Sequence, residues 1–371
     1  MLVPFFDLRV LDHDLRSELL EATARVFDHG QLIDGPEVQK FEIIVAEKIG
    51  VKYAVGVGSG SSALYLSLKA VGIGAGDEVI TTPLTWIITA NAISATGAKP
   101  VFADVLDDYN IDPKKVEKCI TKKTRAIVPM HYAGHMCDMN CLEKIANKYG
   151  LFLIEDAAQA FGGTLNGRSA GSFSLVAGFS MNPMKILGAY GEAGVVVTDD
   201  KKIASKIRQL RHAGTKKDPK KIAINNCFSA ELNHKMDALQ AALLVVALKY
   251  LPKRQKRREE IAVLLKNGLE GIVDLQDTHP NEKHARYMFP INVKKRNALR
   301  EYLHINKIET KTFYIPLASE AVVNKKLKGS TFPNAKKLTR SNLVLPSHEK
   351  LNNSQVEYML KVIQDFSSQY K

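Results

Sequence analysis

Strand-like and helix-like patterns alternate through the middle of the chain, and this alternation constrains the fold more than any other feature. Seven apolar runs of strand length occur, at Tyr53–Val57, Glu78–Thr81, Pro100–Ala103, Ala126–Pro129, Leu151–Ile154, Val176–Ser180 and Gly194–Thr198. Helical periodicity between them is typical of an α/β sheet with covered faces. The 371 residues exceed one ordinary core. We therefore predict a large α/β domain with an N-terminal helical segment over 1–245, and a small α+β domain over 246–371.

Helical patterns outside this region complete the expected elements. They lie at Leu15–His29, Glu37–Ile49, Lys201–His212 and Lys235–Tyr250, with a further helix ending at Leu269. Pro252 is expected to interrupt the long C-terminal pattern, because proline has no N–H to donate within a helix. Residues Thr215–Phe228 form a basic stretch without apolar periodicity, so we expect a loop there.

One lysine lies in a turn between two of the predicted strands. Lys185 follows Val176–Ser180 and precedes Gly194–Thr198, in a segment punctuated by Pro183 and Gly188. A lysine in such a turn can point into a site, where burial lowers the pKa of an amine and makes it nucleophilic. Covalent catalysis through a Schiff base requires such an amine. Most lysines are surface charges, so this signal is weak by itself.

A carboxylate at the end of another strand strengthens the signal. Asp156 follows Leu151–Ile154 and precedes Lys185 by 29 residues. Ligands of open α/β sheets bind at the carboxyl ends of strands. Pyridoxal phosphate (PLP) needs this pair, a lysine for the imine and a carboxylate that keeps the pyridine nitrogen protonated. Without Lys185, a helix N-cap before Ala157 would be an equally good interpretation of Asp156.

A glycine- and serine-rich turn supplies a candidate phosphate site. Gly58–Ser62 follows the strand Tyr53–Val57 and opens the helix Ala63–Ala70. Backbone N–H groups at a helix start, together with small residues and hydroxyls, bind anions. The turn is not the G-x-G-x-x-G of dinucleotide-binding folds, so it indicates a phosphate group rather than NAD.

With these motifs the chain resembles the DegT/DnrJ/EryC1/StrS family of sugar aminotransferases, a branch of the aspartate-aminotransferase-like PLP enzymes of fold type I. The segments that carry the resemblance span nearly the whole chain, at Pro4–Leu8, Gly35–Val38, Ser59–Leu64, Gly76–Ile80, Gly97–Val101, His131–Gly134, Glu155–Gln159 and Phe179–Lys185. The resemblance implies a large domain with a seven-stranded mixed, mainly parallel sheet covered by helices. It also implies a small C-terminal α+β domain.

The resemblance implies roles for individual residues. Lys185 matches the lysine that holds PLP covalently and moves the proton, and Asp156 matches the partner of the ring nitrogen. Gln159 matches the contact to the ring hydroxyl, and Trp86 matches an aromatic residue stacked on the ring, although a core aromatic is the alternative. The implied phosphate contacts are the Gly60 backbone, Ser61, Ser180 and, from the other subunit of a homodimer with shared active sites, Asn233.

Two departures from the family pattern bear on the substrate. Lys235 stands where the family usually has arginine, and Thr312–Ala318 lacks both histidines of the usual motif. The implied reaction moves an amino group, usually from glutamate, to a 3- or 4-keto nucleotide sugar for cell-surface polysaccharide or secondary-metabolite synthesis. A cyclitol or other non-nucleotide ketone and a non-enzymatic regulatory role are the alternatives. The related dehydratases carry histidine in place of Lys185.

The charge balance does not favour nucleic acid. The chain has 52 basic and 39 acidic residues, a formal charge of +13. The basic run Lys253–Arg258 is expected to form a solvated helix face, because no zinc finger or RNA-binding aromatic motif accompanies it. No apolar run reaches the ~20 residues that cross a bilayer, and Met1–Phe5 does not resemble a signal peptide. We therefore expect no membrane association and a cytoplasmic location.

The cysteines and histidines do not predict a metal site. Four cysteines are too few and too scattered for a disulfide scaffold. The residues His131, His135, Cys137 and Cys141 have ligand types that suit zinc. Their spacing matches no common zinc motif, so we expect no metal there. His131 is expected instead to border the cofactor or the substrate.

Overall fold

A seven-stranded sheet forms the centre of the molecule in a computed structural model that describes residues 1–215, 226–321 and 331–369. Its strand order is β1-β9-β8-β5-β4-β2-β3. The strands are β1 (Tyr53–Val57), β2 (Glu78–Thr81), β3 (Lys99–Phe102), β4 (Thr124–Val128), β5 (Phe152–Asp156), β8 (Val176–Ser180) and β9 (Gly194–Thr198). Strand β9 is antiparallel to β1 and β8, and the other neighbours pair in parallel. The predicted fold class is confirmed.

Side chains of each strand alternate between two apolar layers. Val195 and Val197 of β9 belong to the core that contains α8, whereas Val196 belongs to the core that contains α3. Successive side chains of a strand point to opposite faces, so a fully apolar strand is buried on both. The observed limits of β1, β2, β8 and β9 equal the predicted ones. Strand β5 extends further than predicted, because Glu155 and Asp156 continue the ladder with β8.

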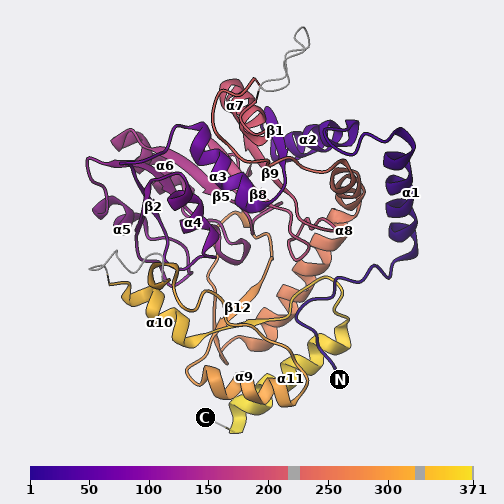
Figure 1. Cartoon of the computed structure of the whole chain (residues 1–371). Helices are drawn as coiled ribbons and strands as arrows, with labels where there is room; N and C mark the ends of the chain where they lie inside the picture. The colour runs from indigo at the N-terminus through magenta and orange to yellow at the C-terminus, as the bar shows by residue number, and fades with distance from the viewer. Residues whose placement is uncertain (216–225, 322–330, 370–371) are drawn as a thin grey trace.

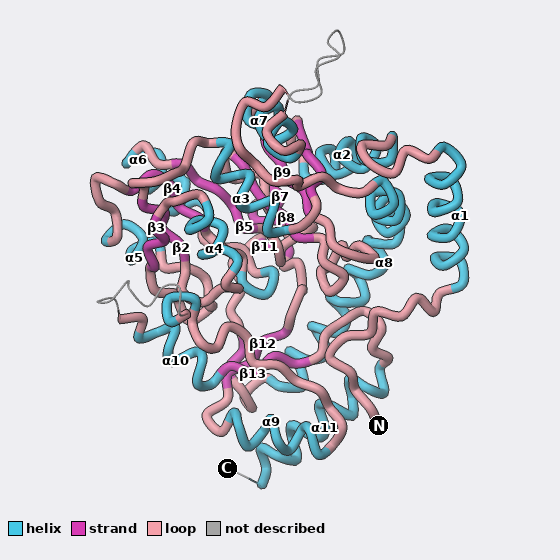
Figure 2. Tube along the Cα trace, in the orientation of Figure 1, coloured by secondary structure: helices cyan, strands magenta, loops and turns pink. Residues whose placement is uncertain are grey.

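Helices cover both faces of the sheet and form the lower part of the molecule in Figures 1 and 2. They are α1 (His13–His29), α2 (Pro36–Ile49), α3 (Gly60–Ala70), α4 (Ile88–Ala95), α5 (Pro113–Lys118), α6 (Met139–Tyr149), α7 (Lys201–Arg211), α8 (Ala238–Leu269), α9 (Arg296–Ile305), α10 (Pro333–Ser341) and α11 (Asn353–Gln369). No helix among the described residues is both long and apolar enough to span a bilayer.

The prediction that Pro252 interrupts the long C-terminal helix is wrong. Helix α8 runs for 32 residues with Pro252 inside it. A proline removes one helical hydrogen bond and can bend a helix without ending it. Leu251 is buried before the proline and Ile261 after it, in the two cores that α8 joins. Apolar burial on both sides therefore outweighs the local cost of the proline.

A further apolar core lies around the end of α8, with α9, α11 and a small antiparallel sheet. This sheet has the order β10-β12-β13, with strands Asp274–Leu275, Phe289–Asn292 and Asn342–Leu345. Val3 belongs to the same core and pairs with Ile308, so the N-terminus lies beside the C-terminal helices (Figure 1). The predicted boundary at residue 245 lies within α8, and the division into two domains remains a prediction.

Two further segments matter for the sites described below. Strands β6 (Thr164–Leu165), β7 (Arg168–Ser169) and β11 (Glu282–Lys283) form a third, antiparallel sheet.

The basic stretch predicted as a loop, Thr215–Phe228, lies largely outside the described residues. Its described ends meet, because Thr215 and Cys227 form an antiparallel bridge.

Candidate active site

Asp156 lies at the carboxyl end of β5, with its side chain buried. Its Oδ2 accepts a hydrogen bond of 2.7 Å from Thr89 Oγ1, and its Oδ1 accepts one of 3.2 Å from the N–H of Ala158. Thr85 in turn lies 2.8 Å from Thr89, oxygen to oxygen. Burial raises the pKa of Asp156, although the bonds from Thr89 and Ala158 and the charge of Lys185 oppose the effect. The carboxylate is thus fixed in position, and no cation of the described part of the chain forms an ion pair with it.

Lys185 lies in a tight turn between β8 and β9. The turn is closed by hydrogen bonds from the Lys185 N–H to the Asn182 carbonyl and from the Ala189 N–H to the Met181 carbonyl, both 2.8 Å. The Lys185 side chain is half-buried, and its Nζ lies 4.3 Å from the centre of the Tyr287 ring. The aromatic face holds the ammonium group through a cation–π contact. The lysine therefore points into the molecule, as the sequence predicted.

Gly60, Ser61 and Ser180 meet at the N-terminus of α3. Ser59 caps this helix by accepting a 3.1 Å bond from the Ser62 N–H, so the helix begins at Gly60. A Cβ atom at Gly60 would lie 2.5 Å from the Ser180 Cβ, so only glycine fits there. Free N–H groups at a helix start, flanked by two serine hydroxyls, form a ready site for a phosphate.

Gln159 is buried beside Asp156 and is held at both ends of its amide. Its Oε1 accepts a 2.8 Å bond from the Ala133 N–H, and its Nε2 donates to the Tyr314 hydroxyl. The Tyr314 ring packs edge-on against Tyr132, with ring centres 5.7 Å apart. Burial raises the pKa of Tyr314 well above its usual value, so the hydroxyl stays neutral. The orientation of Gln159 thus depends on a residue of the C-terminal part of the chain.

Trp86 and Asn233 are both exposed in the single chain. Trp86, between β2 and α4, is 62% exposed, so its alternative interpretation as a core aromatic is wrong. Asn233 pairs through its backbone with His212, and its Oδ1 accepts a 3.2 Å bond from the Lys235 N–H. The side chain of Asn233 remains open to solvent. Among the described residues, Asn233 has no recorded contact with the other predicted site residues.

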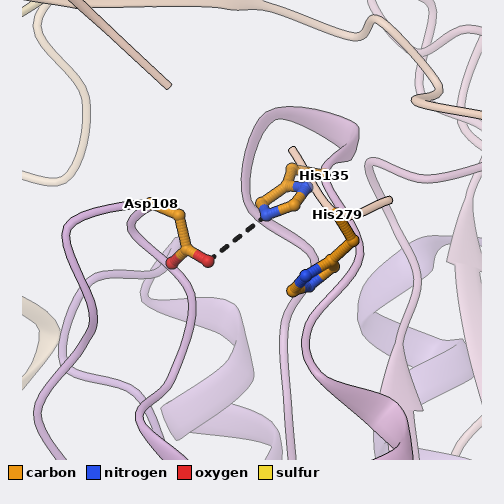
Figure 3. Close-up of side chains that lie close together, drawn as sticks. All are labelled: Asp108, His135 and His279. Carbon is orange, nitrogen blue, oxygen red and sulfur yellow. Dashed lines mark hydrogen bonds and ion pairs between the residues drawn. The ribbon is translucent and has the colours of Figure 1, made fainter. Parts of the chain in front are cut away.

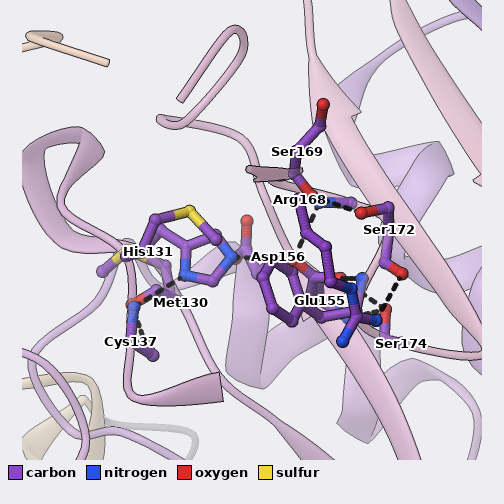
Figure 4. A network of polar contacts seen from close by, with 12 residues as sticks. Met130, His131, Cys137, Glu155, Asp156, Arg168, Ser169, Ser172 and Ser174 are labelled. Carbon is purple, nitrogen blue, oxygen red and sulfur yellow. Dashed lines mark hydrogen bonds and ion pairs between the residues drawn. The ribbon is translucent and has the colours of Figure 1, made fainter. Parts of the chain in front are cut away.

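Both ring nitrogens of His131 are engaged, and its expected place beside the cofactor or substrate stays a prediction (Figure 4). Its Nδ1 accepts a 3.1 Å bond from the Cys137 N–H, so its Nε2 carries the proton that it donates to Glu155 over 2.9 Å. The ring is fully buried. His131 thus supports β5 through Glu155, and neither of its ring nitrogens is left to bind a ligand.

A cavity of about 1000 Å³ opens beside Lys185 and extends to the second half of α8. Basic side chains from this helix line it, among them the half-buried Arg254 and the exposed Lys253 and Lys256. The expectation of a uniformly solvated basic face is wrong for Arg258. That side chain is buried and forms a 2.7 Å ion pair with Glu349.

Sequence analysis missed three residues of this site. Thr89 holds Asp156, Tyr287 faces Lys185, and Tyr314 orients Gln159. The threonines at positions 85 and 89, four residues apart on either side of Trp86, were an available signal for the first. The two tyrosines come from segments more than 100 residues beyond Lys185, and their positions depend on tertiary packing.

The fold and the site define an aminotransferase of fold type I. The model of the DegT/DnrJ/EryC1/StrS aminotransferase family matches residues 13–364. A dTDP-3-amino-3,4,6-trideoxy-alpha-D-glucose transaminase of Streptomyces venezuelae is 37% identical to the chain over 373 residues. The match covers 98% of this chain and 96% of the transaminase. The chain belongs to the DegT/DnrJ/EryC1/StrS aminotransferase family.

Other relatives and solved structures agree with this assignment. A pleiotropic regulatory protein of Geobacillus stearothermophilus is 36% identical and matches 99% of both chains. The crystal structure of S. venezuelae DesV in complex with a ketimine intermediate superposes with a TM-score of 0.93, 36% identity and 98% coverage of each chain. NtdA of Bacillus subtilis with bound cofactor PMP gives a TM-score of 0.92 at 28% identity, over 99% of this chain and 86% of that one.

Proposed function

We propose that this protein is a PLP-dependent aminotransferase that moves an amino group from an amino acid, glutamate in the usual case, to a keto sugar carried by a nucleotide diphosphate. The observation that carries the proposal is the placement of a buried carboxylate, Asp156, at the end of β5, beside the strand β8 that leads into the Lys185 turn. The helix start at Gly60 adds a phosphate site. PLP, when bound, supplies an electron sink for the carbon beside the amino nitrogen.

The residues of the chain then have separate tasks. Asp156 would stabilise positive charge on a ring nitrogen, because a buried carboxylate gains most from a cation in contact with it. Thr89 fixes the carboxylate, and the Gln159 amide, held by Ala133 and Tyr314, would contact the ring hydroxyl. Lys185 provides the amine that binds the aldehyde and carries a proton. The Gly60 N–H, Ser61 and Ser180 hold the phosphate.

The basic lining of the cavity supports a substrate with phosphate groups. Arg254 and Lys256 line the same cavity as Lys185. Cations that line one cavity raise the local concentration of an anionic substrate. The relatives named as dTDP-sugar transaminases favour a nucleotide sugar over a cyclitol. The carbon that receives the amino group is C3 or C4 of the sugar.

A homodimer completes the proposed site. The side chain of Asn233 is exposed, and the adjacent Leu232 is 73% exposed. Leu20 and Phe27 of α1 are also exposed, at 63% and 62%. Large exposed apolar side chains favour a protein interface. We therefore keep Asn233 as a contact to the cofactor phosphate of the partner subunit. We keep the cytoplasm as the location, because the four cysteines are free thiols.

Labelling of Lys185 tests the proposed function directly. The PLP-loaded protein should absorb in the visible range, and borohydride reduction should attach the cofactor permanently to Lys185. The Lys185→Ala variant should lose both the attached label and turnover. Lys122→Ala, at an exposed lysine, is the matched control. A label on another residue, or turnover by Lys185→Ala at the wild-type rate, contradicts the assignment.

The substrate is identified by a second experiment. The pyridoxamine form of the protein is mixed with a panel of keto sugar nucleotides and cyclitol ketones, and mass spectrometry shows which compound gains an amine. Bleaching of the visible band by glutamate separates an enzyme from a regulatory protein on the same scaffold. A protein that binds PLP but is not bleached by any amino acid favours the regulatory role.

A further inference from the structure

Three residues with metal-binding side chains, none of them a proposed active-site residue, converge in Figure 3. Asp108 lies between β3 and α5, His135 follows the short helical turn Tyr132–Gly134, and His279 lies between β10 and β11. One ligand atom from each residue lies within 4.8 Å of the ligand atoms of the other two. Segments far apart in the sequence thus bring two imidazoles and a carboxylate to one point.

The distances fit one small cation. Asp108 Oδ2 lies 3.3 Å from His135 Nε2. Two ligands that bind one zinc ion tetrahedrally at about 2.0–2.1 Å are separated by roughly 3.3 Å. The rings of His135 and His279 are 4.7 Å apart, centre to centre. His279 Nε2 lies 3.0 Å from the Met136 carbonyl oxygen, and one nitrogen of this ring lies within 4.8 Å of the other two ligand atoms.

A second carboxylate orients these residues. Glu282 Oε2 lies 2.7 Å from the other nitrogen of His135, Nδ1. The same glutamate accepts hydrogen bonds from the N–H groups of Met136 and His279, at 2.8 and 3.1 Å. A histidine that binds metal through one nitrogen commonly has its second nitrogen held by a carboxylate. This arrangement leaves His135 Nε2 free to face Asp108 and a metal ion.

We propose that Asp108, His135 and His279 bind one divalent transition-metal ion of the zinc class. Two imidazoles and one carboxylate suit zinc and similar ions rather than magnesium or calcium, which prefer oxygen ligands. His135 is 1% exposed, whereas Asp108 and His279 are half-buried and give an ion access from solvent. The set that sequence analysis weighed and rejected shares His135 alone with this one.

The ion would brace a segment that reaches the proposed active site. The N–H groups of Ala285 and Tyr287 donate to the carbonyls of Gly134 and Ala133, both over 3.1 Å. The Tyr287 ring faces Lys185. Metal binding next to these contacts therefore stabilises the position of Tyr287 from a distance, without touching substrate or cofactor.

A proton competes with the metal ion for His135 Nε2. Burial lowers the pKa of His135, but hydrogen bonds from its ring to Asp108 and Glu282 raise that pKa to about 9. A charged histidine between two carboxylates is the alternative account of the cluster. The titration that tests the proposal is therefore carried out at pH 8.5, where this competition is weaker than at neutral pH.

Calorimetric titration of the PLP-loaded protein, free of any histidine tag, with zinc chloride tests the proposal. We expect saturable binding of one ion per chain, a higher melting temperature with zinc, and no effect of magnesium. His279→Gln keeps a donor for the Met136 carbonyl but removes the ligand, so zinc affinity should fall by about tenfold or more. His13→Gln, at an exposed histidine, should bind zinc as the wild type does.

Cobalt(II) substitution identifies the ligand atoms. Nitrogen and oxygen ligands give visible bands without the near-ultraviolet charge-transfer band of a cobalt–thiolate bond. That thiolate band would assign the ion to a cysteine and overturn the proposal. Absence of one-to-one zinc binding, or unchanged affinity in His279→Gln, would overturn it as well and leave the cluster as an ion-pair network. Because His279 is half-buried, its replacement is less disruptive than that of His135.

Discussion

Two adjacent carboxylates on β5 face opposite sides of the sheet and behave in opposite ways. Glu155 accepts hydrogen bonds from His131, Ser174 and the N–H groups of Gly171 and Phe173, at 2.8–3.0 Å. Its pKa is lowered, because these bonds outweigh the effect of burial. Asp156 accepts two bonds, and burial raises its pKa. Both are buried, so burial alone does not distinguish a structural carboxylate from a functional one.

The difference lies in how completely each charge is compensated. The carboxylate of Glu155 is saturated by fixed donors and serves to hold the segment at Gly171 against the strand. The charge of the Asp156 carboxylate is only partly compensated by its two hydrogen bonds, and a protonated ring nitrogen would compensate the rest. An incompletely compensated charge at the edge of a sheet costs stability in the free protein and gains binding energy for the cofactor.

Asp156→Asn should have the largest effect on activity. Removing a charge about 4 Å from a cation in a partly buried site loses about 4 kcal/mol, which is roughly a thousandfold in rate. The free protein should become slightly more stable at neutral pH. The pKa of Asp156 is raised in the folded state. Its carboxyl group therefore costs no stability below the unfolded pKa of 3.8, and the free energy of unfolding falls as pH rises through the folded-state pKa. Steady-state kinetics and thermal unfolding of the apo form check both results.

Glu155→Gln should have the opposite profile. A glutamine amide accepts through one oxygen only, so some of the four donors lose their partner at a cost of about 1–3 kcal/mol of unfolding free energy, whereas the folded fraction should keep its turnover. The lowered pKa of Glu155 stabilises the fold above the usual value of 4.5, and this stability is lost as pH falls below it. Denaturant unfolding from pH 3 to 7 should show a shallower acid slope in the variant. A large loss of turnover at full folding would remove the distinction between the two carboxylates.

Gly60→Ala tests the proposed phosphate site at the start of α3. The added Cβ would lie 2.5 Å from the Ser180 Cβ. Overpacking of this kind costs about 1–3 kcal/mol, and here it also displaces the start of α3. We expect PLP affinity to fall by about tenfold, measured by fluorescence titration. Gly72→Ala, at an open position far from the site, is the control for general effects of the substitution, although its positive φ adds some strain.

Tyr314→Phe should have the smallest effect. It removes the hydroxyl that contacts Gln159 and keeps the ring against Tyr132. One net hydrogen bond contributes about 1 kcal/mol, so we expect about a fivefold change in PLP affinity or turnover. Stability should hardly change. An effect as large as that of Asp156→Asn would make Tyr314 part of the catalytic group rather than a residue that positions Gln159.

Local sequence chemistry was sufficient for most of the central sheet and its turns. The strands next to Gly58–Ser62, Asp156 and Lys185 were predictable because they are short, apolar and bounded by turn residues. The start of α3 was three residues earlier than expected, since Ser59 caps the helix ahead of Gly60. The error at Pro252 has the same origin, because local propensity does not include the burial that holds α8 together.

The sequence by itself determined the sheet, the lysine turn and the carboxylate at the strand end, because hydrophobic period and turn chemistry are local properties. Tertiary structure decided which face of β5 is functional, since His131 and Ser174 saturate Glu155 from one side only. It also brought Tyr287 and Tyr314 to the site, and His279 to Asp108 and His135. Such contacts join residues more than 100 positions apart, and packing of whole elements, rather than any local pattern, fixes them.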